Sequence, residues 1–116
     1  FEWCRACLYA IKSNIKLAKN RNPELHIIHH HLEAQKFETK IQVLDESFTI
    51  FLDPPYEDHE VYQSVLAQLK LAKADVWVET DKHKGPKIID LELWSGRKAG
   101  KSYKQGSSSL IKLDLV

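Results

Sequence analysis

Apolar side chains recur at helical spacing in two segments of the chain, residues 3–20 and 57–73. In the first segment, basic residues fill the rest of the cylinder, and Asn20, Asn22 and Pro23 end the pattern. In the second, acidic residues stand in the first turn, where the helix dipole favours them. We therefore predict two helices, with apolar faces made of Cys4, Leu8, Ile11, Ile15 and Ala18 in the first and of Tyr62, Val65, Leu66 and Leu69 in the second.

Short apolar runs predict the strands. These runs lie at residues 25–29, 48–52, 75–80, 88–94 and 109–115. The run at 48–52 is apolar without interruption, as expected for a strand buried on both faces. The remaining segments are interpreted as one or two helical turns at 32–40, a loop at 82–87 and a long polar hairpin connection at 95–108.

Helices and strands alternate along most of the chain, an order typical of a parallel sheet with helices on its faces. We predict an α/β fold with a mostly parallel sheet and a C-terminal antiparallel β-hairpin. The length of 116 residues suits one domain, and 43% hydrophobic with 28% charged residues is ordinary for a globular protein. No apolar run approaches the ~18 residues of a membrane span. With two cysteines and no secretory leader, a cytoplasmic location is expected.

Charge is unevenly distributed along the chain. Residues 1–81 hold 9 Lys and Arg against 13 Asp and Glu, whereas residues 82–116 hold 8 against 3. A basic segment of this kind is typical either of a phosphate-binding face or of a solvated edge. The predicted nucleic-acid contacts are the cations of the 95–108 connection and the tyrosine among them, namely Arg97, Lys98, Lys101, Tyr103 and Lys104.

The segment FLDPPY, residues 51–56, places an acid, two prolines and an aromatic residue directly after a predicted strand. In an open parallel sheet this is the crevice where ligands bind. Prolines offer carbonyl groups but no N–H. Asp53 and the Pro54 carbonyl could therefore accept the two hydrogens of an amino group on a nucleobase. Tyr56 could stack on that base, a contact worth ~1–3 kcal/mol. The predicted acceptor site is Asp53, Pro54, Pro55 and Tyr56; the simpler alternative is a plain strand-to-helix turn.

FLDPPY resembles the motif of S-adenosylmethionine-dependent methyltransferases that act on amino groups of nucleic-acid bases. The wider chain is similar to the small-subunit (16S) rRNA guanine-N2 methyltransferase family, in the segment FEWCRACLYAIKSNIKLA, in the VWVET strand and in the basic final hairpin. The resemblance covers nearly the whole chain, and its specific part is the DPPY quartet. It implies a class I methyltransferase (Rossmann-like) fold, S-adenosylmethionine as cofactor, and rRNA or the assembling small ribosomal subunit as partner.

The resemblance also assigns residues to the cofactor. Glu2 matches an acid that binds the ribose hydroxyls of the cofactor. The run His29, His30 and His31 stands where the family has a small acidic or amide residue that contacts adenine, and His31 is the predicted cofactor contact. Glu79 stands where the family often has an acid, and we assign it no role from the sequence.

The glycine-rich cofactor turn of the family should precede Glu2, but all four glycines lie between residues 85 and 106. The resemblance therefore implies a single partial methyltransferase domain over residues 1–116, without the N-terminal strand or strands. We expect the apolar edge at 48–52 to be open to pairing with another chain. We also expect these 116 residues alone to bind S-adenosylmethionine weakly.

Other functions stay open at this point. The quartet also serves in DNA adenine-N6 methyltransferases, and the missing glycine turn favours a non-catalytic nucleic-acid-binding fragment. The segment WCRAC, residues 3–7, looks like the redox motif of thioredoxins, but that family has a strand before it and here only two residues precede. The cysteines and the histidines at 26 and 29–31 lack the spacing of a structural zinc site, and no metal is predicted.

Overall fold

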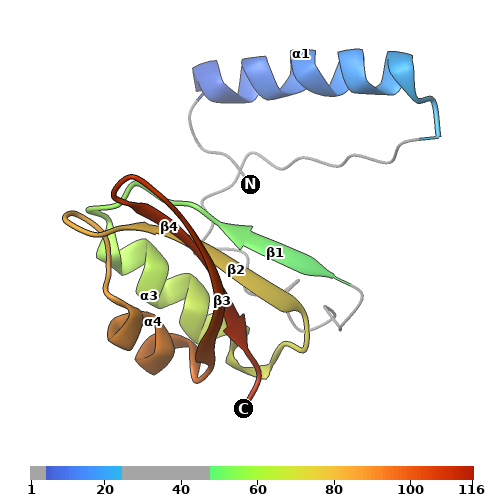
Figure 1. The fold of residues 1–116 in the computed structure, drawn as a ribbon. Helices are drawn as coiled ribbons and strands as arrows, with labels where there is room; N and C mark the ends of the chain where they lie inside the picture. Colours follow the sequence, from blue (N-terminus) through green and yellow to red (C-terminus); the bar gives the residue numbers. More distant parts are fainter. Residues whose placement is uncertain (1–4, 25–47) are drawn as a thin grey trace. The chain divides into compact units, whose positions relative to one another are not determined.

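The computed structural model of the chain describes residues 5–24 and 48–116 (Figure 1). The chain divides into two compact units, Phe1–Phe37 and Glu38–Val116. The described part of the first unit is helix α1 (Arg5–Arg21) and the three residues after it. The strand predicted at 25–29 and the helical turns predicted at 32–40 lie outside the described residues.

Helix α1 confirms the helix predicted at residues 3–20 over its described part. Among the side chains described in α1, Ile11, Ile15 and Ala18 are half-buried and the others are exposed. These three residues are spaced as one face of a helix, and they belong to the predicted apolar face. The helix ends where expected, with the Asn22 N–H donating to the Ala18 carbonyl at 3.0 Å and Pro23 following.

Four strands form the sheet of the second unit: β1 (Thr49–Leu52), β2 (Asp75–Asp81), β3 (Lys98–Gln105) and β4 (Ser108–Asp114). Their spatial order is β1-β2-β4-β3. Strand β1 is parallel to β2, whereas β4 is antiparallel to both of its neighbours, β2 and β3. The described sheet is therefore mixed, which corrects the prediction of a mostly parallel sheet. The C-terminal antiparallel hairpin is present, and its second strand lies between β2 and β3 rather than at the edge.

Strand β1 is the terminal strand of this order and is more exposed than its composition predicts. Within the described residues it pairs only with β2. Leu52 is buried, but Phe51 is 67% exposed and Phe48 is 47% exposed. The prediction that residues 48–52 are buried on both faces is therefore wrong for this unit as described. The expected pairing of this edge with another chain stays a prediction.

The segment predicted as a strand at 88–94 is helix α4 (Ile88–Ser95). Capping interactions at both ends favour the helix. At its start, the Lys87 N–H donates to the Asp90 side chain at 3.2 Å. At its end, Gly96 has φ +67 and its N–H donates to the Glu92 carbonyl. The connection predicted at 95–108 is mostly strand β3, and the hairpin turn is short, with Gly106 at φ +62. Strand β3 was missed because it has no apolar run: it is an exposed strand that, among the described strands, pairs only with β4.

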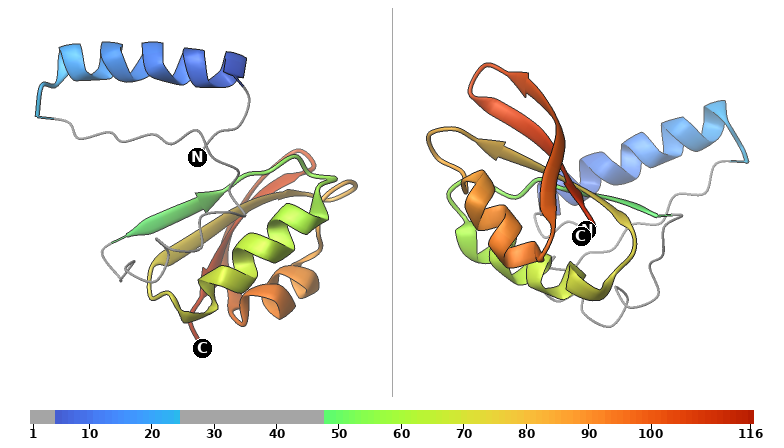
Figure 2. Two further views of the ribbon diagram at one scale, coloured as in Figure 1. Left: turned by 180° about the vertical axis from the view of Figure 1, so that it is seen from behind. Right: turned by 60° about the horizontal axis from the view of Figure 1, so that its bottom comes forward.

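Helices α3 (His59–Gln68) and α4 lie side by side on one face of the sheet (Figures 1 and 2). Helix α3 continues into a 3-10 turn, η2 (Leu69–Leu71), so the helix predicted at 57–73 is confirmed in its central part. Its predicted apolar face is also confirmed, because all four of its residues are buried. The core between helices and sheet consists of Tyr62, Val65, Leu66, Leu69, Val76, Val78, Leu91, Ile111 and Leu113.

Candidate functional site

The DPPY turn lies at the carboxyl end of β1, beside the carboxyl end of β2. The two strands are parallel and Leu52 pairs with Val78, so the residues that follow, Asp53 and Glu79, are brought to the same edge of the sheet. Asp53 is exposed overall, but partial desolvation of its carboxyl raises the pKa, and the negative charge of Glu79 raises it further. Two acids therefore meet at this edge.

Two tyrosine hydroxyls fix the arrangement around Glu79. The Tyr56 hydroxyl donates to Glu79 Oε1 at 3.2 Å and lies 3.2 Å from Ser108 Oγ at the start of β4. The Tyr62 hydroxyl, from helix α3, donates to the Glu79 carbonyl at 2.7 Å. The side chain and the main chain of Glu79 are thus each held by one tyrosine. Tyr56 itself is half-buried.

Tyr62 is a site residue that the sequence reasoning assigned only to the core. Its ring is fully buried, and burial together with the charge of Asp53 raises the pKa of its hydroxyl far above the usual range. A buried tyrosine generally needs a hydrogen-bond partner. An amphipathic aromatic residue on the buried face of the helix after the motif was the one signal available in the sequence.

The Pro54 carbonyl keeps most of its capacity to accept a hydrogen bond. The Tyr62 hydroxyl has one hydrogen, and it lies 2.7 Å from the Glu79 carbonyl but 3.4 Å from the Pro54 carbonyl. Because the shorter contact takes the hydrogen, the longer one is at most weak. Asp53 is exposed and Pro54 is half-buried, so neither residue is enclosed in the core.

A cavity of about 440 Å³ adjoins Tyr56. Its lining includes Glu79 and Ser108, the two residues that contact the Tyr56 hydroxyl. The opposite side is formed by the hairpin of β3 and β4. The complete lining is Glu79, Tyr103, Lys104, Gln105, Ser108, Ser109 and Leu110. The cavity therefore extends from the basic hairpin, which is predicted to contact RNA, to the two residues that contact the Tyr56 hydroxyl.

The hairpin presents cations and an aromatic ring on its surface. Lys98, Lys101 and Lys104 are exposed, and Tyr103 is 55% exposed. The Tyr103 ring stacks on Trp77 of β2 with centroids 6.0 Å apart, and Lys101 Nζ lies 5.9 Å from its centroid. The stacking on Trp77 holds the Tyr103 ring in place beside the lysines. An aromatic ring next to positive charges is an arrangement suited to binding bases and phosphates.

Arg97 is placed differently from the other predicted nucleic-acid contacts. It is 3% exposed, and its guanidinium donates to the carbonyls of Ala72 at 2.6 Å, Ala74 at 3.0 Å and Leu113 at 3.3 Å. These carbonyls come from three separate segments, so Arg97 ties them together. Both Nη atoms donate inside the fold and the side chain is buried, which replaces the predicted RNA contact with a structural role.

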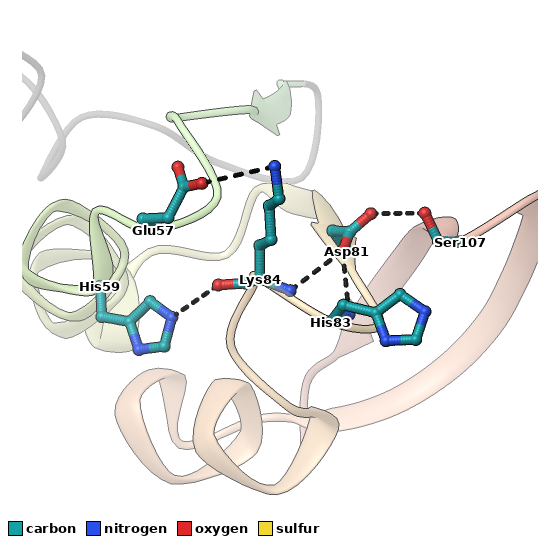
Figure 3. A network of polar contacts seen from close by, with 6 residues as sticks. All are labelled: Glu57, His59, Asp81, His83, Lys84 and Ser107. Atoms are coloured by element: carbon teal, nitrogen blue, oxygen red, sulfur yellow. Dashed lines mark hydrogen bonds and ion pairs between the residues drawn. The ribbon is translucent and has the colours of Figure 1, made fainter.

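A polar network around Asp81 connects the end of β2 to the hairpin (Figure 3). Asp81 Oδ1 accepts the N–H groups of His83 at 2.9 Å and Lys84 at 3.0 Å, and Oδ2 accepts the Ser107 hydroxyl at 2.6 Å. The Lys82 N–H donates to the Ser107 carbonyl at 2.8 Å. Since Ser108 follows directly, the network sets the position of the residue that contacts Tyr56.

The predicted loop at 82–87 is confirmed and folds tightly back on β2. The Gly85 N–H donates to the Asp81 carbonyl at 2.9 Å, and Thr80 Oγ1 donates to the Pro86 carbonyl at 2.8 Å. A Cβ atom at Gly85 would lie 2.1 Å from Thr80 Oγ1, so the close approach requires glycine. Lys84 also forms an exposed ion pair with Glu57 at 3.8 Å (Figure 3).

Replacing Asp81 with Asn is expected to lower the thermal midpoint at neutral pH. The Ser107 hydroxyl and then the two backbone N–H groups hold the pKa of Asp81 below its ordinary 3.8. A depressed carboxyl pKa stabilises the fold above the unfolded-state value, and the effect is lost as pH falls through the folded-state value. The difference in midpoint between wild type and Asp81→Asn should therefore be full at pH 7 and shrink below about pH 3.8. An unchanged difference at acidic pH would contradict this assignment.

The remaining predicted residues lie outside the described part of the chain. Glu2, His31 and Cys4 are among them, and Cys7 is exposed on α1. Across residues 5–24 and 48–116, no group of three or more His, Cys, Asp and Glu side chains is placed to hold a metal ion. The helices in these residues also lack the length and apolar character needed to cross a membrane.

The mixed four-stranded sheet and its helices are consistent with part of a methyltransferase-like fold. Residues 2–108 match the family described as conserved hypothetical protein 95. The match spans most of the chain, and the chain belongs to this family, which contains rRNA methyltransferases. Neither a curated protein nor a solved structure matches the chain.

Proposed function

We propose that the protein methylates the N2 amino group of a guanine in 16S rRNA with S-adenosylmethionine as methyl donor. The observation that carries the proposal is the pair of acceptors, the carboxyl of the exposed Asp53 and the weakly engaged Pro54 carbonyl, in a turn whose tyrosine hydroxyl contacts Glu79. Membership of a family that contains rRNA methyltransferases supports the reaction class. The guanine atom and the small-subunit substrate rest on the resemblance in the sequence.

The chain's own residues have the task of holding the amino nitrogen. Asp53 accepts one of its hydrogens and the Pro54 carbonyl the other, so the nitrogen lone pair points away from the turn. Tyr56 supports the ring of the base, and a guanine within a helix must be extruded to reach it. Fixing the direction of the lone pair is the main contribution to rate, because alignment alone can supply ~7–11 kcal/mol of a barrier.

S-adenosylmethionine, when bound, would supply the methyl group from its sulfonium, which would become a neutral thioether, and the methylated amino nitrogen would then lose one proton to solvent water. The residues proposed to hold it are Glu2 and His31, as the resemblance implies. The described residues fit the acceptor side of this reaction, since they offer hydrogen-bond acceptors and no competing N–H at the two prolines. Residues 1–116 are proposed to form a single partial methyltransferase domain that acts in the cytoplasm.

The proposed macromolecular partner is rRNA or the assembling small ribosomal subunit. Lys98, Lys101 and Lys104 would contact phosphates, and Tyr103 would offer a stacking surface at the mouth of the cavity. The hairpin continues directly into Ser108 beside Tyr56, so RNA held there leads toward the acceptor turn. Pairing of the open β1 edge with another chain is proposed as a second contact.

Reversing the charge of Lys101 and Lys104 is expected to weaken RNA binding by at least about tenfold at moderate salt, because two phosphate contacts are lost. The slope of log affinity against log salt should fall by about 0.7 for each contact. The double variant K70E/K73E is the matched control, since both lysines are exposed and precede β2 in the chain. Equal losses in both double variants would refute a specific hairpin contact.

The proposed function is tested by methyl incorporation from labelled S-adenosylmethionine into three substrates, using the complete gene product. The substrates are small-subunit rRNA, large-subunit rRNA and adenine-containing duplex DNA. Incorporation confined to small-subunit rRNA is the expected result. Incorporation into the DNA would favour adenine-N6 chemistry, and none into any substrate would favour a non-catalytic RNA-binding role.

A further inference from the structure

Glu79 lies at the proposed site, yet the proposed reaction leaves it without a task. We infer that Glu79 selects guanine over adenine by accepting the N1–H of the base whose amino group is held by Asp53 and Pro54. The inference rests on the proposed function and names a specificity-determining residue within it. It follows from the hydrogen-bonding chemistry of the base edge and from the way Glu79 is held.

The two purines differ in the atom next to the amino group. Guanine presents the N1–H donor beside its N2 amino donors, whereas adenine presents the N1 lone pair beside its N6 amino group. An ionised carboxylate is an acceptor only, with about four lone-pair sites on two oxygens. A carboxylate at this place therefore attracts the guanine edge and repels the adenine edge. The DPPY turn cannot make this distinction, because it holds only the amino group common to both.

Glu79 is placed to read that neighbouring atom. It follows Val78, the partner of Leu52 across the parallel pair, so Glu79 and Asp53 end neighbouring strands at the same edge, and the charge of Glu79 acts on the Asp53 carboxyl. The side chain is half-buried and lines the cavity, so a base that enters can reach it. A base with two adjacent donors bridges the two acids, while adenine would leave one of them facing a lone pair.

Glu79 is also held more firmly than an ordinary half-exposed glutamate. The Tyr56 hydroxyl fixes Oε1 at 3.2 Å, and the Tyr62 hydroxyl fixes the backbone carbonyl at 2.7 Å. One tyrosine hydroxyl occupies only one of the lone-pair sites, which leaves the others for a ligand. A fixed acceptor discriminates better than a mobile one, since it cannot turn away from the wrong base.

The substitution Glu79→Gln tests this inference, because it is expected to change which base the site prefers. Glutamine offers one acceptor and one donor in nearly the same shape. It therefore matches 2-aminopurine, which carries the amino group of guanine but a lone pair at N1. The probes are pentaribonucleotides with two uridines on each side of guanine, 2-aminopurine or adenine. Binding is measured by competition against fluorescein-labelled rRNA, and methyl acceptance is measured on the same probes.

The wild-type protein is expected to prefer guanine over 2-aminopurine by roughly 10- to 100-fold in both readouts. Glu79→Gln should reduce this ratio to near one or reverse it, and Glu79→Ala should abolish the preference without reversing it. Asp58→Asn is the matched control, because it makes the same acid-to-amide change at an exposed residue just before α3 and should leave the base preference unchanged. If Glu79 had only a structural role, its replacement would lower the binding and the methyl acceptance of all three probes by the same factor.

A ratio of guanine to 2-aminopurine binding that is the same in wild type and Glu79→Gln would overturn the inference, whatever the absolute affinities. Failure of the proposed function has a different signature, in which the wild-type protein transfers no methyl group to any guanine substrate. The competition readout does not depend on methyl transfer, so the two failures are distinguished.

Discussion

Replacing Asp53 with Ala is expected to lower the rate of methyl transfer by at least roughly a hundredfold, because misalignment of a reacting group by about 1 Å has that cost. The variant loses a hydrogen bond to a charged acceptor, worth about 1.5–3 kcal/mol, and with it the direction of the amino nitrogen. Initial rates on small-subunit rRNA measure the effect. A loss below about threefold would exclude Asp53 as the residue that holds the amino group.

The same substitution is expected to stabilise the fold at neutral pH. The pKa of Asp53 is raised by burial and by Glu79, so the native state holds its proton more tightly than the unfolded state does. The ionised form is therefore unfavourable in the native state, and wild-type stability rises as pH falls through the raised value. Asp53→Ala should raise the thermal midpoint at pH 7 and remove this part of the pH dependence. Opposite effects on rate and midpoint are expected of a residue held for function.

Asp58→Asn is the matched control for Asp53. Asp58 is exposed in the same turn and makes no side-chain bond at the start of α3. It should change neither the rate nor the midpoint appreciably. If it lowers the rate as much as Asp53→Ala, general negative charge in this turn, rather than a placed acceptor, supports the reaction.

Replacing Arg97 with Met is expected to lower the free energy of unfolding by about 3 kcal/mol, since buried acceptors left without donors cost about 1–3 kcal/mol each. The variant keeps an unbranched chain but removes the donors that reach Ala72, Ala74 and Leu113. Arg97→Lys should be nearly as damaging, because one ammonium cannot span three carbonyls as the planar guanidinium does. Urea unfolding curves measure both variants.

Lys98→Met is the matched control for Arg97, because Lys98 is the next residue and is exposed. It should stay within about 0.5 kcal/mol of wild type, as surface substitutions generally do. If Arg97→Met also stays within that range, the three carbonyls are not energetically dependent on Arg97 and its structural role is refuted.

The parts of the fold that followed from the sequence are those where local pattern and burial agree. Helix α3 was predictable because Tyr62, Val65, Leu66 and Leu69 repeat at helical spacing and all face the core. Helix α4 was mistaken for a strand because apolar residues occupy most of it, while Ile89 and Leu93 are in fact 71% and 72% exposed. Its end signals at Asp90 and Gly96 outweigh that pattern.

Only the part of the candidate site that lies in one continuous motif was predictable from the sequence. Asp53 to Tyr56 are adjacent in the chain, so their chemistry is visible together. Glu79 joins them through a parallel strand pairing, and Tyr62 through a helix, and neither relation has a local signature. Arg97 shows the converse error: a cation within a basic segment looks exposed until the carbonyls around it are known.

The identity of the methylated nucleoside tests the account most directly. Small-subunit rRNA treated with the complete gene product and S-adenosylmethionine is digested to nucleosides and analysed by mass spectrometry. We predict N2-methylguanosine, absent from the reaction with Asp53→Ala. N6-methyladenosine as the product, or N2-methylguanosine formed equally by the Asp53→Ala variant, would contradict an acceptor site built on Asp53 and Pro54 and read by Glu79.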